Sequence, residues 1–168
     1  MTDILELPDS ALTSAERLWL RDQAAELPKD AMIIHIGVER GVSMHCSRAG
    51  NKTATVIGID LQPSRFNGKQ DKHMGLVKAD SGTVEMEQSV DFLFVDGDHS
   101  ELGVLADINA WVDRIAGVIA FHDYGWGDRF PWVRGVKVAV DAWDWSGWEL
   151  IEAPDSIRAY RRKAEADD

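Results

Sequence analysis

The sequence of 168 residues has one cysteine, Cys46, and is poor in positive charge. A single cysteine excludes an intramolecular disulfide, which fits a reducing compartment. Lysine and arginine together number 18 against 29 aspartates and glutamates, which gives a formal net charge of −11. Such a chain repels phosphate backbones on average, so nucleic-acid binding is not expected as its main role.

Long apolar runs are also missing. No run approaches the roughly 20 residues that span a bilayer, and the acidic start MTDILELPDS lacks the layout of a signal peptide. We therefore expect a cytoplasmic protein without membrane contact. The length and the 45% of hydrophobic residues predict a single domain over residues 1–168, with an N-terminal extension at 1–11 and a polar tail at 163–168.

Short apolar runs alternate with segments of helical spacing. Helical periodicity is expected from Thr13 to Leu27, over 101–115 and over 133–143. Thr13 and Glu16 have the spacing of a capping box, and Leu18 and Trp19 belong to the expected apolar face of the first of these helices. The segments WELIEAP and SIRAYRR alternate like the strands of a hairpin. This order predicts an α/β fold with a mostly parallel central sheet, a C-terminal antiparallel hairpin and helices on both faces. The runs with the signature of buried parallel strands are AMIIHIG, ATVIGID, GLVKAD, DFLFVD and GVIAFHD.

Glycine, acidic or imidazole side chains stand where each predicted strand ends. Ligands bind beyond the carboxyl ends of the strands in open parallel sheets, and these ends meet at one edge. The pattern predicts one shared site at that edge, with ordinary loop polarity as the alternative. The residues concerned are Gly37, Asp60, Asp80, Asp96, His122 and Asp123.

The first strand is followed by two glycines, Gly37 and Gly41, in IHIGVERGVS. Glycine there lets the backbone approach a ligand and turn into a helix whose N-terminus favours negative charge. The spacing differs from the dinucleotide pattern G-x-G-x-x-G. Asp60 follows Gly41 by 19 residues and is placed to accept hydrogen bonds from two ribose hydroxyls. A nucleoside-containing cofactor is predicted; an ordinary turn and a turn aspartate are the alternatives.

Taken in order, these motifs resemble those of the class I S-adenosylmethionine-dependent methyltransferases, and in particular methyltransferase family 24. The resemblance extends over roughly residues 12–162 and implies a Rossmann-like methyltransferase fold with S-adenosylmethionine as the cofactor. The matching stretches are IIHIGVERGVS, VIGIDLQP, VKADS, DFLFVDGDHS and AGVIAFHDY.

The resemblance also implies which residues bind the cofactor. Gly37 and Gly41 would pass close to its methionine part, Asp60 would bind the ribose hydroxyls, and Asp80 with Ser81 would flank the adenine. His35 stands where the family usually has an acid that helps to hold the methionine ammonium group. His35 is therefore either a cofactor contact or a buried histidine satisfied by the backbone.

Some methyltransferases of this layout bind a divalent cation at the ends of the fourth and fifth strands. By position the resemblance implies Asp96, His122 and Asp123 as ligands of Mg²⁺ or Mn²⁺, which would activate and align an acceptor hydroxyl. Imidazole suits Mn²⁺, Fe²⁺ or Zn²⁺ better than Mg²⁺, so His122 is alternatively a general base. His99 is a second base candidate. The catalytic candidates are thus Asp96, His99 and His122, with a metal-free site as the alternative.

The expected activity is methyl transfer from S-adenosylmethionine to a small-molecule acceptor, at a hydroxyl oxygen. A non-catalytic module that binds the same cofactor or a nucleoside is the alternative. Trp126 and Trp132 lie in the stretch YGWGDRFPWVRG after the fifth strand. They predict either a rim that binds an aromatic acceptor or a contact within a homo-oligomer.

Overall fold

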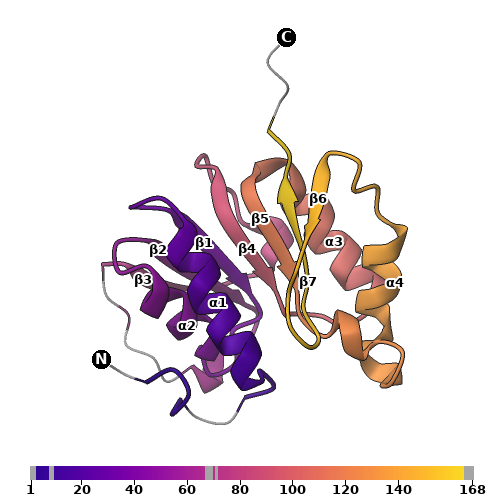
Figure 1. The fold of residues 1–168 in the computed structure, drawn as a ribbon, viewed down its shortest axis with the longest axis horizontal. Coiled ribbons are helices and arrows are strands. Elements are labelled where there is room, and N and C mark those ends of the chain that lie inside the picture. Colours follow the sequence, from indigo (N-terminus) through magenta and orange to yellow (C-terminus); the bar gives the residue numbers. More distant parts are fainter. Residues whose placement is uncertain (1–2, 8–9, 67–69, 71, 165–168) are drawn as a thin grey trace.

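The described residues, 3–7, 10–66, 70 and 72–164 of a computed structural model, build a seven-stranded sheet (Figure 1). The strand order is β3-β2-β1-β4-β5-β7-β6, in which β1 to β5 are parallel and β7 runs antiparallel between β5 and β6. This arrangement confirms the predicted sheet with its C-terminal hairpin. The strands are β1 (Met32–Ile36), β2 (Thr55–Asp60), β3 (Met74–Lys78), β4 (Val90–Val95), β5 (Ile115–Phe121), β6 (Trp148–Ile151) and β7 (Arg158–Arg162).

Helices cover both faces of the sheet because the apolar strand residues alternate between two clusters. Ile33 belongs to the cluster under one pair of helices, and its neighbour Ile34 belongs to the cluster under the other pair. In Figure 1, α1 and α2 lie beside the β1–β2–β3 half, and α3 and α4 lie toward β5 and the hairpin. The helices are α1 (Ser14–Glu26), α2 (Val42–Gly50), α3 (Glu101–Trp111) and α4 (Arg134–Ala142).

The structure corrects the predicted extent of α3. The helix ends at Trp111, and a 3-10 turn, Val112–Arg114, leads into β5 at Ile115, which helical spacing had assigned to the helix. The Arg162 guanidinium holds this junction, since it donates to the carbonyls of Val112 and Ile115 at 2.5 Å each. An apolar residue such as Ile115 satisfies helical and strand periodicity equally, so spacing alone did not separate them.

The start of α1 forms the predicted capping box. Thr13 Oγ1 accepts from the Glu16 amide at 3.2 Å, and the Thr13 amide donates to Glu16 Oε2 at 2.8 Å. The buried face of the helix differs from the apolar face expected at Leu18 and Trp19, since both are only half-buried. The buried residues of α1 are instead Glu16, Arg17, Leu20 and Ala24.

The predicted N-terminal extension packs onto the body of the protein in its described parts. Ile4 is buried, and the Arg17 guanidinium donates to the carbonyls of Ile4 and Leu7. Residues 1–2 and 8–9 of this extension and residues 165–168 of the predicted tail lie outside the described residues. Within the described ranges, no helix combines the length and apolar character needed to cross a membrane.

Candidate functional site

The ends of the parallel strands meet at one edge, as predicted, and enclose a cavity of about 870 Å³. Most of the predicted site residues line this cavity: Gly37, Asp60, Asp80, Ser81, Asp96, His99 and Asp123. Three others, His35, Gly41 and His122, do not contribute to its wall. The cavity therefore joins the positions predicted for a cofactor to those predicted for an acceptor.

Gly37 shapes the floor of the cavity where β1 and β4 end. Its φ of +79° lies in the left-handed region, and a Cβ there would overlap the backbone carbonyl of Asp96. The Gly37 amide donates to Ile59 at 2.9 Å, and the Asp96 amide donates to Ile36 at 2.8 Å. Glycine is thus required for the close approach of these strand ends, and the exposed backbone provides room for a ligand.

Asp60 organises the turn after β1 as well as lining the cavity. Its Oδ2 accepts from the amides of Val38 at 2.8 Å and Glu39 at 3.4 Å, and its Oδ1 accepts from Gln62 at 2.6 Å. The alternative drawn from the sequence, a turn aspartate, is therefore observed, whereas the ribose contact stays a prediction. A carboxylate oxygen accepts more than one hydrogen bond, so the two roles are compatible. Asp60 keeps acceptor capacity toward the cavity, where a ribose hydroxyl would fit.

Asp80 and Ser81 lie at the next strand end, where they meet a residue that the sequence did not single out. Asp80 Oδ1 accepts from the Gly82 amide at 2.9 Å and so caps the turn Ser81–Thr83. The Ser81 hydroxyl donates to Oδ1 of Asp107, a buried cavity residue on α3. Burial raises the pKa of Asp107 to about 6, opposed by the Ser81 hydrogen bond and reinforced by Asp80 and Asp98.

His35 does not reach the cavity, so the predicted contact with a cofactor is corrected. Its side chain is fully buried on the face of β1 that packs against α2, with Nε2 3.1 Å from Ser47 Oγ. Burial lowers its pKa to about 3, with the Asp96 charge opposing the shift, so the imidazole is neutral. The histidine is buried, as the alternative had it, but its partner is the Ser47 hydroxyl instead of the backbone, and Nδ1 has no partner among the described residues.

His122 is buried behind the cavity wall, among the carboxylates of Glu16, Asp96 and Asp123. Nδ1 lies 3.1 Å from Asp96 Oδ1, and Nε2 lies 3.3 Å from Glu16 Oε2. Burial alone would lower the pKa of His122, but the Asp96 charge and the hydrogen bonds to its carboxylate neighbours raise it to about 12. Both ring nitrogens of His122 thus face carboxylates, and its side chain does not contribute to the cavity wall. The ligand and base roles given to His122 stay predictions.

Glu16 is the partner of His122 that the sequence did not reveal. Its side chain is fully buried, and Oε1 accepts from the Ser156 amide at 3.0 Å and from the Ser156 hydroxyl at 2.5 Å. Burial would raise the pKa of Glu16, but His122, Ser156 and the Thr13 amide together lower it. The carboxylate that completes the capping box thus also neutralises a buried imidazolium 106 residues away.

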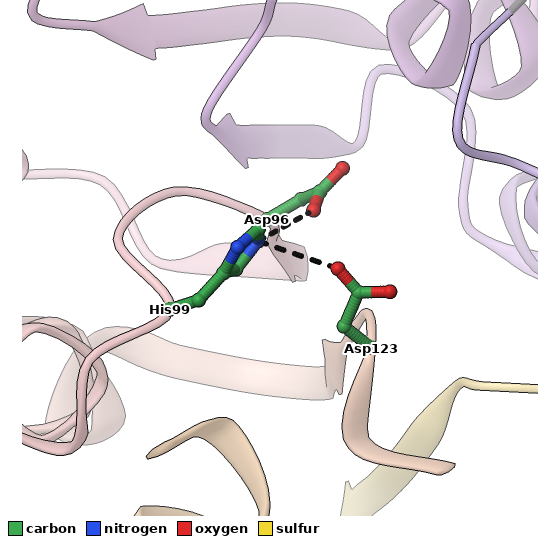
Figure 2. Close-up of side chains that lie close together, drawn as sticks. All are labelled: Asp96, His99 and Asp123. Carbon is green, nitrogen blue, oxygen red and sulfur yellow. Dashed lines mark ion pairs between the residues drawn. The ribbon is translucent and has the colours of Figure 1, made fainter. Parts of the chain in front are cut away.

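Figure 2 shows the group that faces the cavity: the His99 imidazole lies between the Asp96 and Asp123 carboxylates. His99 Nε2 is 3.5 Å from Asp96 Oδ1 and 3.4 Å from Asp123 Oδ2, distances of ion pairs without hydrogen-bond alignment. Interaction with Asp96 raises the pKa of His99 against the effect of burial. Burial would raise the pKa of Asp96, but His122 and His99 lower it to about 2. Asp123 is held with a φ of +62°.

The same three residues are a candidate cation site, since one donor atom of each lies within 4.8 Å of the others. The imidazole of this candidate cation site is therefore that of His99, whereas the sequence indicated His122. Two carboxylates and an imidazole suit Mn²⁺ better than Mg²⁺. Asp98 and Ser100 stabilise the start of α3. Asp98 Oδ1 accepts a hydrogen bond from the Ser100 amide, and the Ser100 side chain caps the helix.

The tryptophan-rich segment does not line the cavity. None of residues 124–134 belongs to its wall, so a rim formed by Trp126 and Trp132 is not observed. Trp132 is 72% exposed and stacks on Phe130 with ring centroids 5.0 Å apart. The alternative role, a contact in a homo-oligomer, stays a prediction.

The strand order, the antiparallel β7 inserted beside β5 and the cavity at the carboxyl edge define a Rossmann-like methyltransferase of class I. A family model described as a methyltransferase domain matches residues 34–124, which is more than half of the chain. The chain therefore belongs to methyltransferase family 24. By sequence, no curated protein matches it.

Solved structures share the fold at low sequence identity. A protein from Corynebacterium glutamicum has 13% identity and a TM-score of 0.70, with 95% of this chain and 85% of that chain covered. An O-methyltransferase from Bacillus cereus, solved with S-adenosylhomocysteine, has 16% identity and a TM-score of 0.63, at 93% and 84% coverage. The N-methyltransferase NodS from Bradyrhizobium japonicum has 12% identity and a TM-score of 0.63, at 88% and 94% coverage.

Proposed function

We propose that the protein transfers the methyl group of S-adenosylmethionine to a hydroxyl oxygen of a small molecule. The observation that carries this proposal is the His99 imidazole between two carboxylates on the wall of the cavity that also contains Gly37 and Asp60. A hydroxyl has to lose its proton to attack, whereas a neutral amine does not, so a base at this position favours an oxygen acceptor. Family membership and the S-adenosylhomocysteine-bound structures of similar fold support the cofactor.

The described residues fit this cofactor. Asp60 accepts hydrogen bonds from the ribose hydroxyls, and the open backbone at Gly37 leaves room for the methionine part. Carboxyl groups outnumber guanidinium groups on the cavity wall. A negative wall stabilises a sulfonium cation more than the neutral thioether left after transfer, which favours exchange of product for cofactor.

The reaction is an in-line displacement, in which the acceptor oxygen bonds to the methyl carbon while the carbon–sulfur bond breaks and sulfur keeps the electron pair. His99 takes the hydroxyl proton at Nδ1, the ring nitrogen that does not face the carboxylates, and Asp96 and Asp123 beside the buried Nε2 stabilise the imidazolium that forms. Positioning of the two reactants supplies most of the rate gain in such a step. A divalent cation held by the same three side chains would instead lower the pKa of the acceptor hydroxyl.

Replacing Asp60 with alanine is expected to weaken S-adenosylhomocysteine binding about 10- to 100-fold, because hydrogen bonds from the ribose to a charged acceptor are lost. Isothermal titration calorimetry measures this change. Asp22→Ala removes an exposed carboxylate on α1, outside the cavity, and should leave the affinity at its wild-type value. Equal affinities of the Asp60 and Asp22 variants would show that Asp60 does not bind the ribose.

Replacing His99 with glutamine should lower turnover about 10²- to 10⁴-fold and leave cofactor affinity unchanged, as expected for loss of a general base. Transfer of a labelled methyl group to a panel of phenols and alcohols measures it. The interaction with Asp96 raises the pKa of His99, so the activity of the wild type should increase as the pH rises through a value above 6.5. The His99 variant should not show this increase of activity with pH.

Chelation separates the two modes of proton removal. Full activity in excess chelator identifies His99 as the base, and loss of activity that Mn²⁺ restores identifies the cation site. Tight cofactor binding without turnover on any acceptor would favour the alternative, a binding module of the same fold.

A further inference from the structure

Asp107 is a buried carboxyl group on the cavity wall that the methyl-transfer step does not use. Its side chain is 5% exposed and lies on the inner face of α3. The Ser81 hydroxyl donates to its Oδ1, whereas Oδ2 accepts no hydrogen bond from the parts of the chain that the structure describes. Oδ2 is therefore open to the cavity rather than enclosed by protein, and an open carboxylate oxygen can accept a hydrogen bond from a ligand.

Residues with small side chains line the cavity beside Oδ2. Gly97, Gly103 and Ala106 line the cavity beside Asp107, and Gly97 is close enough that a Cβ on it would lie 3.9 Å from Oδ2. The Trp111 indole N–H donates to the Ser81 carbonyl at 3.2 Å and fixes the residue that orients Asp107. Small side chains around a firmly held acceptor leave space for an aromatic base to approach Oδ2 edge-on.

We propose that Asp107 recognises the adenine of the cofactor by accepting a hydrogen bond from its 6-amino group at Oδ2. This assignment rests on the proposed function, because it requires that the cavity binds S-adenosylmethionine. Asp80 and Ser81, the residues expected beside the adenine, adjoin Asp107 in the same part of the cavity. Asp107 is therefore a specificity-determining residue for the base.

The charge and the orientation of Asp107 both select an amino group. An ionised carboxylate accepts hydrogen bonds and donates none, so it repels the 6-oxo group of hypoxanthine. Ser81 occupies Oδ1, which directs Oδ2 toward the ligand. The charged groups that act on Asp107 are Asp80 and Asp98; both add to the effect of burial, which raises its pKa to about 6. Preference for adenine should accordingly grow as the pH rises through about 6 and the carboxylate forms.

The test compares S-adenosylhomocysteine with S-inosylhomocysteine, in which an oxo group replaces the 6-amino group, by calorimetry. Wild-type protein at pH 7.5 should bind the adenine compound about 10- to 100-fold more tightly. In Asp107→Asn the amide oxygen keeps the Ser81 hydrogen bond and the amide N–H₂ faces the base, so the preference should disappear or reverse. The matched control Asp113→Asn, an exposed change outside the cavity, should keep the wild-type preference.

A pH series on wild-type protein tests the proposal without any variant. Groups that do not touch the base affect both affinities equally, so they cancel in the ratio of the two affinities. This ratio should fall toward one as the pH decreases through about 6. A ratio independent of pH, or an adenine preference retained by Asp107→Asn, would overturn the role of Asp107 while leaving the proposed function intact. Absence of S-adenosylhomocysteine binding by the wild type would refute the proposed function itself.

Discussion

Replacing Glu16 with glutamine is expected to lower the free energy of unfolding by about 3–5 kcal/mol at pH 7, the usual cost of breaking a buried ion pair. The amide N–H₂ would face donors, either the Nε2–H of His122 and the Thr13 amide or the Ser156 amide and hydroxyl. The His122 imidazolium would also keep two counter-charges, Asp96 and Asp123, instead of three. Urea unfolding followed by tryptophan fluorescence measures the change, which is a large part of the total stability of a typical domain.

Glu26→Gln is the matched control, because Glu26 lies on the same helix and its side chain is 64% exposed beside Arg161. Its loss should change stability by less than about 0.5 kcal/mol. Similar losses in the two variants would contradict a buried ionic network at Glu16.

The same network predicts how wild-type stability depends on pH when chelator is present. Unfolded His122 releases its proton near pH 6.5, whereas folded His122 keeps it to about pH 12, so the free energy of unfolding should decrease as the pH rises above 6.5. The pKa of Asp96, lowered to about 2, acts in the opposite direction, since its contribution is present above about pH 4 and is lost below it. Maximal stability is expected between these limits.

Replacing Gly37 with alanine should cost about 3 kcal/mol or more of folding free energy and prevent cofactor binding. A Cβ at this position overlaps the Asp96 carbonyl, and the φ of +79° is unfavourable for any L side chain. Relief of the overlap would separate β1 from β4, which are joined there by the hydrogen bond from Asp96 to Ile36. Thermal unfolding and S-adenosylhomocysteine titration measure the two effects.

Gly75→Ala provides the control for this substitution. Gly75 lies in β3, and a Cβ added to it would meet no atom within 4 Å in the part of the chain that the structure describes. Its replacement should leave both the unfolding temperature and the cofactor affinity near their wild-type values. An equally small effect at Gly37 would mean that the strand ends tolerate a side chain.

Much of the architecture follows from the apolar runs and from what stands at their ends. Parallel strands carry Asp60, Asp80 and Asp96 to one edge whatever the details of packing, so the location of the cavity was predictable. The boundary between α3 and β5 was not, because Val112 and Ile115 are buried under either assignment.

The strand ends identify an edge, but alternation along a strand decides which face a side chain takes. His35 follows Ile33 by two residues, and His122 follows Ala120 by two, so both imidazoles belong to the face covered by α1 and α2. The Phe94 ring lies on that face near both, at 5.6 and 6.1 Å between ring centroids. Applying this alternation along each strand to the sequence would have predicted that both histidines lie in the core and not in the cavity.

Glu16 and Asp107 illustrate two limits of sequence patterns. The capping box explained Glu16 locally, and no spacing connects it to His122, which lies 106 residues later. Asp107 did carry a signal: it is an acid at a helical position between Val104 and Trp111, on the buried side of α3. A charged residue on an apolar helix face requires a partner, which for Asp107 is Ser81.

The hydrogen bond from Ser156 to Glu16 joins residues that are 140 positions apart. A chain emerges from the ribosome with its N-terminus first, so α1 is made long before the turn that leads into β7. Until His122 and that turn have both been made, the Glu16 carboxylate lacks its counter-charge and two of its hydrogen-bond donors, so burying it would cost free energy. We therefore expect the core over α1 to close only after the turn that leads into β7 has been synthesised.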